Sequence, residues 1–93
     1  MSQKLEELQR KLPLLLVVLF GSYARGNYTV ASDVDLLVVY QGKERKNAYA
    51  LVKKTLDTPN LEPHTYSAKE YAEMKNTIDR MIRDGIILYQ GNK

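Results

Sequence analysis

The sequence contains no cysteine and no tryptophan, and only three of its 93 residues are proline. Without cysteine, disulfide frameworks, thiolate metal sites and cysteine nucleophiles are all excluded. The absence also fits a reducing compartment, so we expect a cytoplasmic protein. The longest apolar run is the seven residues from Leu14 to Phe20, whereas a membrane-spanning helix needs about 20. The sequence therefore predicts neither a membrane span nor a disulfide-stabilised fold.

What the chain does contain is an ordinary globular balance of 44% apolar and 27% charged residues, which argues against disorder. A chain of this length forms one hydrophobic core, so we expect residues 1–93 to make a single domain. The 14 basic and 11 acidic residues leave a net charge of +3, and the excess is concentrated in residues 43–54. Such a patch suits either an anionic partner or a solvated helix face. No recognised nucleic-acid-binding motif accompanies it, so direct nucleic-acid binding is not expected.

The hydrophobic pattern predicts alternating helices and strands. An amphipathic helix over 2–12 ends before Pro13, because proline disfavours helical backbone in the residue that precedes it. The order of elements predicts an α+β fold, an α/β sandwich in which a small mixed β-sheet is flanked by helices. The remaining predicted segments are strands over 14–20, 33–40, 61–66 and 86–89, and helices over 22–25, over 43–56 and between Ser67 and Gly85.

The last predicted helix has the clearest end signals. Ser67 and Glu70 fit a capping box, in which each side chain binds the backbone N–H of the other residue. Apolar residues then recur at helical spacing, with Met74 and Ile78 on the predicted buried face. Gly85 suits the left-handed residue that ends such a helix.

The loop between the first two predicted strands carries the residues for which we expect chemistry. It begins with Gly21-Ser22, and ten residues later Asp33-Val34-Asp35 stands at the head of the second strand. Carboxylates two apart on a strand point to the same side and repel each other unless a cation lies between them. Oxygen ligands without adjacent histidine or cysteine favour Mg²⁺ or Mn²⁺, which share coordination with substrate phosphates.

The glycine and serine suit the phosphate end of the same substrate. Gly21 lets the backbone approach a phosphate closely, because it has no side chain. Ser22 opens the short helix, whose free amides suit a polyphosphate. Its hydroxyl can donate to a phosphate oxygen, and Arg25 can supply a cation. A phosphate loop and metal-binding carboxylates on adjacent strands are the arrangement of nucleotidyl transfer from a metal-bound triphosphate.

Gly21-Ser22, ten residues and then Asp33-x-Asp35 resemble the signature of the minimal nucleotidyltransferases of the DNA polymerase beta-like superfamily. The flanks GSYARG and SDVDLLVVY and the Gly-Ile-Ile-Leu-Tyr ending are similar to those of the family as well. The resemblance implies a mixed sheet flanked by helices, ATP with Mg²⁺ (or Mn²⁺), and AMP transfer to an acceptor. It also implies an antitoxin of a HEPN/MNT toxin–antitoxin module. The partner of such an antitoxin is an all-helical HEPN toxin, usually a ribonuclease, and some antitoxins silence it by adenylylating a tyrosine.

The third carboxylate departs from the superfamily's pattern. The superfamily normally has an aspartate on a later strand, and the predicted third strand has none. Alignment of the apolar residues places Glu62 there, so Asp33, Asp35 and Glu62 are the predicted catalytic residues and metal ligands. His64 faces the same way and is the alternative base, because imidazole exchanges protons near neutral pH; otherwise it is an edge-strand histidine without a task. Pro63 indicates an edge strand, since it cannot donate to a ladder.

Two functions follow from these observations. The first is a Mg²⁺-dependent nucleotidyltransferase that transfers AMP from ATP to a protein acceptor, with Gly21, Ser22 and Arg25 on the triphosphate. The second is an antitoxin with a degenerate centre that neutralises its partner by covering it, an alternative motivated by the missing third aspartate. The sequence leaves open the acceptor, the number of AMP units added and the oligomeric state, a homo-oligomer included.

Overall fold

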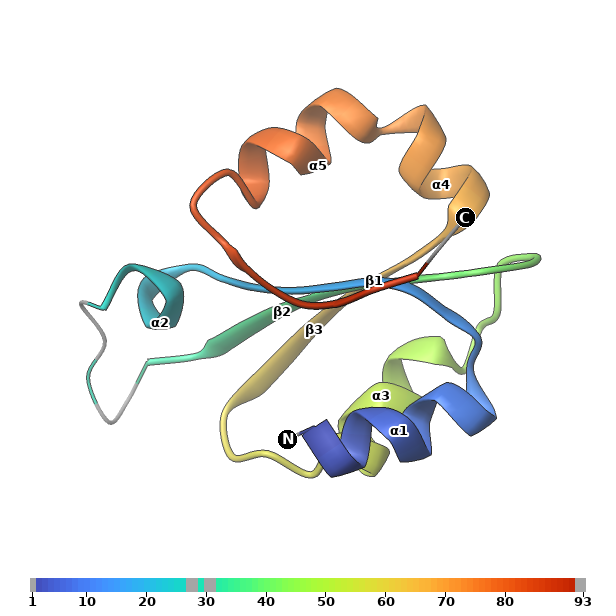
Figure 1. Cartoon of the computed structure of the whole chain (residues 1–93), viewed down its shortest axis with the longest axis horizontal. Coiled ribbons are helices and arrows are strands. Elements are labelled where there is room, and N and C mark those ends of the chain that lie inside the picture. The colour runs from blue at the N-terminus through green and yellow to red at the C-terminus, as the bar shows by residue number, and fades with distance from the viewer. Residues whose placement is uncertain (1, 27–28, 30–31, 92–93) are drawn as a thin grey trace.

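The computed structural model describes residues 2–26, 29 and 32–91, and it consists of a four-stranded mixed sheet between two layers of helices (Figure 1). The predicted α+β fold is confirmed, and the four strands agree with their expected ranges to within one residue at each end. No helix in the described part of the chain is long and apolar enough to cross a membrane. In chain order the elements are α1 (Ser2–Lys11), β1 (Leu14–Phe20), α2 (Ser22–Arg25), β2 (Val34–Tyr40), α3 (Ala48–Leu56), β3 (Leu61–Ser67), α4 (Ala68–Glu73), α5 (Lys75–Met81) and β4 (Ile86–Gln90).

The strand order across the sheet is β3-β2-β1-β4. The central strand β1 is antiparallel to both of its neighbours, β2 and β4. β2 and β3 are parallel, and α3 forms the crossover that a parallel pair requires. β3 is an edge strand, as Pro63 predicts. The two most apolar segments of the sequence therefore form the middle of the sheet.

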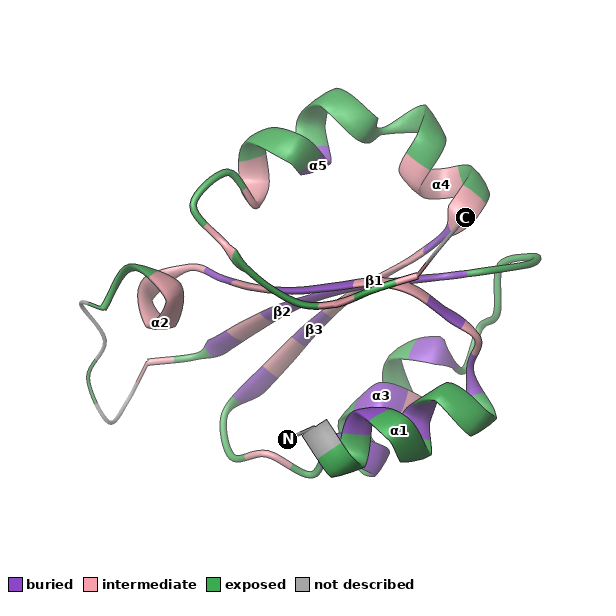
Figure 2. Cartoon of the chain, viewed as in Figure 1, coloured by how far each residue is buried: buried purple, intermediate pink, exposed green. Residues whose placement is uncertain are grey.

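One hydrophobic cluster lies on each face of the sheet. α1 and α3 cover one face, and α4 and α5 cover the other (Figure 1). Leu8 of α1 and Val52 of α3 are fully buried against the first face, whereas Ile78 alone is buried among the residues of α4 and α5. In Figure 2 the buried colour accordingly marks β1, β2, β3, α1 and α3, while α4 and α5 are exposed or intermediate except at Ile78. The second helical layer therefore contributes less apolar burial than the first.

The helix expected over 43–56 begins only at Ala48, so its first five residues were predicted wrongly. Residues 41–47 are all exposed, and a short helix without an apolar face to bury is not stable in water. The backbone N–H of Arg45 instead donates to the hydroxyl of Tyr40 (2.9 Å). This bond holds the segment beside the end of β2.

The helix expected after Ser67 is split into α4 and α5 at Met74, which has φ −111° and ψ 20°. The sequence pattern placed Met74 on the buried face, but its side chain is 41% exposed, and residues 72–77 are all exposed. No buried side chain holds the middle of the segment in one straight helix. The predicted capping box is confirmed: Glu70 N–H donates to Ser67 Oγ (3.2 Å), and Ser67 N–H donates to Glu70 Oε1 (2.9 Å).

Gly85 has a different role from the left-handed helix end that the sequence predicts. Its φ is not positive, unlike that of Gly21. A Cβ on Gly85 would lie 2.5 Å from Val18 Cγ1 and 2.9 Å from the carbonyl oxygen of Leu19. Gly85 is therefore required for space, because it lets the turn between α5 and β4 pack directly on β1.

Candidate active site

The candidate site lies at the end of the sheet where β1 finishes and β2 and β3 begin. Phe20 is opposite Asp35 in the register of β1 and β2, and Asp35 is opposite Glu62 in the register of β2 and β3. Residues opposite each other in a sheet project from the same face. Phe20 and Leu37 pack into the cluster that contains Ile78, so this row faces the layer formed by α4 and α5.

Gly21 and Asp35 approach each other closely. Gly21 has φ +83°, a backbone conformation that residues with side chains rarely adopt. A Cβ at this position would collide with Oδ2 of Asp35 and would lie 3.2 Å from its Cγ. The backbone that opens the predicted phosphate loop is therefore in contact with one of the predicted metal-binding carboxylates.

His64 also belongs to this row. Its Nε2 lies 3.3 Å from Oδ1 of Asp35, and both side chains are about 30% exposed, at 31% and 29%. The ring of Phe20 packs on the imidazole, with centroids 5.1 Å apart and planes tilted by 58°. Both contacts are made by the single histidine of the chain. They place His64 beside the carboxylate that the sequence singled out.

The other predicted carboxylates lie at different depths. Asp33 immediately precedes β2 and is exposed, whereas Glu62 is half-buried in β3. Within the part of the chain that the structure describes, no three histidine, aspartate or glutamate residues are grouped closely enough to hold a metal ion. Mg²⁺ is typically bound by one or two carboxylates, with waters and substrate phosphates completing its shell. Asp33 and Asp35 fit that donor set, and Glu62 is not gathered with them into a three-ligand cluster.

The loop that follows β1 forms the short helix that the sequence predicts. α2 begins at Ser22, directly after Gly21, and Arg25 N–H donates to the carbonyl oxygen of Gly21 (3.2 Å). Gly26 then ends the helix with φ +80°. Ser22 is half-buried and Arg25 is exposed. Both residues follow Gly21 within one helical turn, and Arg25 lines the same cavity as Gly21.

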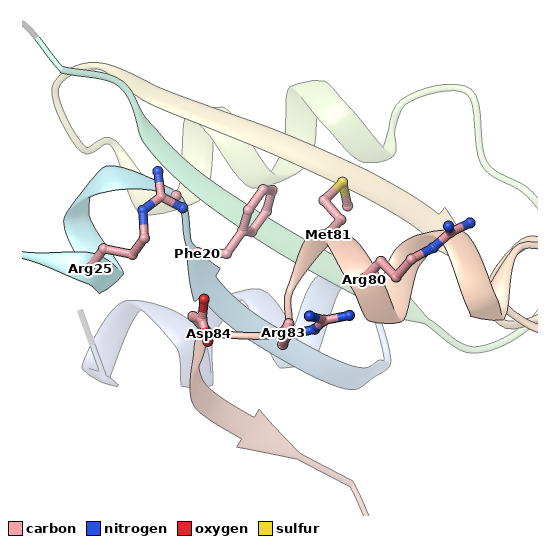
Figure 3. Close-up of a pocket in the computed structure, with 8 residues that line it drawn as sticks. Phe20, Arg25, Arg80, Met81, Arg83 and Asp84 are labelled. Carbon is pink, nitrogen blue, oxygen red and sulfur yellow. The ribbon is translucent and has the colours of Figure 1, made fainter.

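A cavity of about 190 Å³ adjoins the site on the α5 side, and of the residues that line it only Gly21 and Arg25 were predicted site residues. In Figure 3, Arg25 approaches from α2, while Arg80 and Arg83 extend from the end of α5 and the turn after it. A basic pair three residues apart at a helix end was the signal that could have found them. The cavity is lined by Phe20, Gly21, Arg25, Arg80, Met81, Arg83, Asp84 and Gly85.

The sequence model of the nucleotidyltransferase domain matches residues 1–88. A protein from Methanocaldococcus jannaschii, named a "putative protein adenylyltransferase", is 65% identical over 23 residues. That stretch is 25% of this chain and 23% of the relative's length, so less than a quarter of the relative is matched.

Three solved structures share the fold over nearly the whole chain. A "putative nucleotidyltransferase" from Sulfolobus solfataricus is 26% identical with a TM-score of 0.61, over 96% of this chain and 76% of that one. A mutant of the toxin–antitoxin MntA-HpeT is 19% identical with a TM-score of 0.67, over 99% and 75%. A toxin–antitoxin structure with AMP-PNP is 19% identical with a TM-score of 0.65, over 98% and 74%. At 19% identity the last two show a common fold.

Proposed function

The chain belongs to the nucleotidyltransferase domain family, and from this premise we propose that it transfers AMP from ATP to a protein acceptor as the antitoxin of a toxin–antitoxin pair. The observation that carries the proposal is the contact between Gly21 and Asp35, because it joins the predicted phosphate loop to a predicted metal-binding carboxylate. The M. jannaschii relative, by its name, and the structure with AMP-PNP, by its ligand, support an adenylyl donor. We take residues 1–93 as a single minimal nucleotidyltransferase domain.

The proposed nucleotide site combines anionic and cationic groups. Asp33 and Asp35 would hold Mg²⁺ or Mn²⁺, with Glu62 as the third carboxylate, and a metal ion bound there offsets the negative charge of the triphosphate. The backbone of Gly21 would lie against the phosphates. The hydroxyl of Ser22 and the guanidinium of Arg25, the two nearest donors in the sequence, would complete the loop's contacts.

In the proposed reaction a hydroxyl oxygen of the acceptor forms a bond to the α-phosphorus of ATP. The bond between the α-phosphorus and the bridging oxygen breaks, and pyrophosphate leaves. The hydroxyl proton passes to a base, for which Glu62 and His64 are the two candidates. Both project from the same face as Asp35, since all three lie in register on β2 and β3. The positive charge of Arg25 favours departure of the pyrophosphate.

The proposed partner is an all-helical HEPN-type toxin that supplies the acceptor residue. The solved toxin–antitoxin structures that share this fold support a toxin as the partner. Apolar side chains of β4 are also accessible to a protein, because Ile86, Ile87 and Leu88 are 48%, 58% and 37% exposed. β4 is an edge strand of the sheet as well, and an edge strand can pair with another chain.

Mass spectrometry of the partner tests the catalytic proposal. The protein is incubated with its genomic neighbour, Mg²⁺ and ATP, and we expect the neighbour to gain the mass of one or more AMP units. The double variant Asp33→Asn, Asp35→Asn should lose the transfer. A matched variant, Glu44→Gln with Glu73→Gln, removes two exposed carboxylates on other segments and should retain it. Absence of any modification with ATP, GTP, CTP and UTP would contradict the proposal.

The second candidate function is neutralisation by covering the toxin, with no need for catalysis. The sequence motivates it, because glutamate stands where the superfamily normally has its third aspartate, and the exposed apolar side chains of β4 are available to a partner. The aspartate double variant separates the two functions in a toxin-inhibition assay. If the variant inhibits the toxin at the same stoichiometry as the parent, covering is sufficient. If inhibition requires both aspartates and ATP, the catalytic function is the relevant one.

A further inference from the structure

The cavity beside Gly21 is lined by two arginines, Arg80 and Arg83, that the proposed function does not use. Arg80, the penultimate residue of α5, and Arg83, in the turn that follows, line it together with Arg25 (Figure 3). Arg25 and the other two arginines belong to elements that are far apart in the sequence and meet only at this cavity. The feature is therefore a product of the fold.

The cavity is continuous with the candidate active site. Gly21 lines it, and a Cβ on Gly21 would collide with Oδ2 of Asp35. Phe20 lines it as well, and its ring lies 5.1 Å from that of His64, which contacts Asp35. A ligand that passes over Gly21 from Asp35 would enter this cavity.

The turn that carries Arg83 is held firmly against β1. Gly85 packs so closely that an added Cβ would lie within 2.5 Å of Val18 and 2.9 Å of the carbonyl oxygen of Leu19. The N–H of Gly85 also donates to the carbonyl oxygen of Ile82 (2.9 Å). The bases of the arginine side chains are thus fixed relative to Gly21, although their guanidinium groups are exposed.

The charge of the lining favours an anion. Three arginines and one aspartate, Asp84, are among the lining residues, so the lining has an excess of two positive charges. Within the described residues, none of the three guanidinium groups takes part in an ion pair or a side-chain hydrogen bond, since the ion pairs found there involve other residues. An entering anion would therefore recruit them without breaking an existing pair. Guanidinium groups bind phosphate through paired hydrogen bonds.

The size of the cavity is consistent with a small anionic group. Pockets that enclose a whole drug-sized ligand measure roughly 300–1,000 Å³, and this cavity measures about 190 Å³. This volume has room for a short polyphosphate. We propose that Arg80 and Arg83 bind the terminal phosphates of the nucleoside triphosphate opposite Arg25, and that they hold the pyrophosphate after transfer. This inference rests on the proposed function, because it takes a triphosphate to be the ligand of the Gly21 loop.

Calorimetric titration of three ligands tests the subsite: Mg²⁺–ATP, AMP and inorganic tripolyphosphate. In the double variant Arg80→Gln, Arg83→Gln we expect binding of ATP and tripolyphosphate to weaken about tenfold or more, as charge-assisted hydrogen bonds are lost. AMP, which has no terminal phosphates, should bind within about twofold of the parent. The control variant Lys46→Gln, Lys54→Gln removes the same charge from exposed positions before and within α3 and should leave all three affinities within about twofold.

Two results would overturn the subsite: an arginine variant that binds ATP like the parent, or one that loses AMP and ATP equally. Failure of the parent to bind tripolyphosphate would do the same. These outcomes are separable from a failure of the proposed function. If the parent binds tripolyphosphate through Arg80 and Arg83 but modifies no partner, the subsite stands and the transfer does not. If the partner is modified while the arginine variant binds ATP normally, the transfer stands and the subsite does not.

Discussion

At the scale of single residues, Gly21 is the position where an unusual backbone conformation brings the main chain against a candidate site residue. It has φ +83°, and an added Cβ would collide with the carboxylate of Asp35. We expect Gly21→Ala to abolish AMP transfer and to lower the free energy of unfolding by about 2–4 kcal/mol, since it combines an unfavourable backbone conformation with a steric clash. Urea unfolding and the transfer assay measure the two effects.

Gly26 supplies the matched control for this prediction. Its φ is also positive, at +80°, but no atom lies within 4 Å of an added Cβ. Gly26→Ala should therefore cost only the backbone term, about 1–2 kcal/mol, and should retain AMP transfer. If the two alanine variants lost transfer to the same degree, the contact between Gly21 and Asp35 would not be what the site requires.

Single residues also show what sequence spacing can and cannot predict. The spacing of Gly21, Asp33 and Asp35 placed a glycine and two carboxylates on adjacent strands, and the structure brings Gly21 and Asp35 into contact. Glu62, which the sequence places at the position of the superfamily's third aspartate, is opposite Asp35 in the register of β2 and β3; its role as a ligand or base stays a prediction. The expectation for Gly85 failed, because the atoms that approach a glycine come from other strands and are not visible in local sequence. For the same reason, local sequence did not predict that Arg80 and Arg83 line the same cavity as Gly21.

At the scale of elements, the capping box at the start of α4 is a local feature with a measurable contribution. Glu70→Ala should lower the free energy of unfolding by about 1 kcal/mol, because the buried backbone N–H of Ser67 loses its partner. Glu70→Gln retains an acceptor oxygen and should cost a few tenths of that. Chemical denaturation of both variants measures the difference, and equal losses would mean that the box contributes through charge alone.

A second local feature links α4 and α5 across the break at Met74. Lys75 donates to Asp79 (2.8 Å), and the hydroxyl of Tyr71 donates to the same carboxylate (3.3 Å). The hydrogen bond between Lys75 and Asp79 lowers the pKa of Asp79 and raises the pKa of Lys75. Because the pKa of Asp79 is lower in the folded state, the ionised carboxylate stabilises the fold. This contribution is present at pH values above the unfolded-state pKa of Asp79, and it is lost as the pH falls through the folded-state pKa.

The pair therefore predicts an acid-range effect that is small, since both side chains are exposed. In an NMR titration we expect Lys75→Gln to raise the pKa of Asp79 toward its ordinary value. Lys69→Gln, which removes a lysine of α4 outside this network, should leave it unchanged. An Asp79 titration that is the same in the parent and in Lys75→Gln would rule out the link.

The type of each element was easier to predict than its extent. The ranges of β1 and β2 agreed closely because these buried apolar runs end abruptly at polar or turn residues. The predictions of helix over residues 43–47 and of one unbroken helix across Met74 were wrong. Hydrophobic periodicity indicates which face of a helix could be buried, but it does not tell whether another element covers that face. Residues 41–47 and 72–77 are all exposed; the first segment is not helical, and the second remains helical on either side of a break at Met74.

At the scale of the whole molecule, the sequence predicted a mixed sheet but not the position of β4 beside β1. That position is decisive for the candidate site, because it directs the turn from α5 to β4 back to the end of β1. The placement follows from pairing across about 70 residues of chain, and no local pattern encodes such pairing. The basic wall of the cavity is thus a consequence of topology.

The last prediction concerns ligand-linked stability of the whole chain. Asp33→Asn, Asp35→Asn removes two neighbouring negative charges and keeps the side-chain shape. Two unit charges about 4 Å apart repel by about 1 kcal/mol in water and by more in a cleft. Without metal the variant should therefore be at least as stable as the parent. With Mg²⁺–ATP at about 100 times its Kd, the parent should gain about 2.7 kcal/mol, or roughly 10 °C or more in Tm for a domain of this size.

The variant should gain almost nothing under the same conditions, because its nucleotide site lacks the groups that hold the cation. Thermal melts of both proteins in metal-free buffer, with Mg²⁺ alone and with Mg²⁺–ATP measure this directly. ATP with a chelator should shift the parent little, since the triphosphate and the two carboxylates then repel each other. A double variant that melts far below the parent without metal would make the aspartates structural. Their placement in the active site would then have to be abandoned.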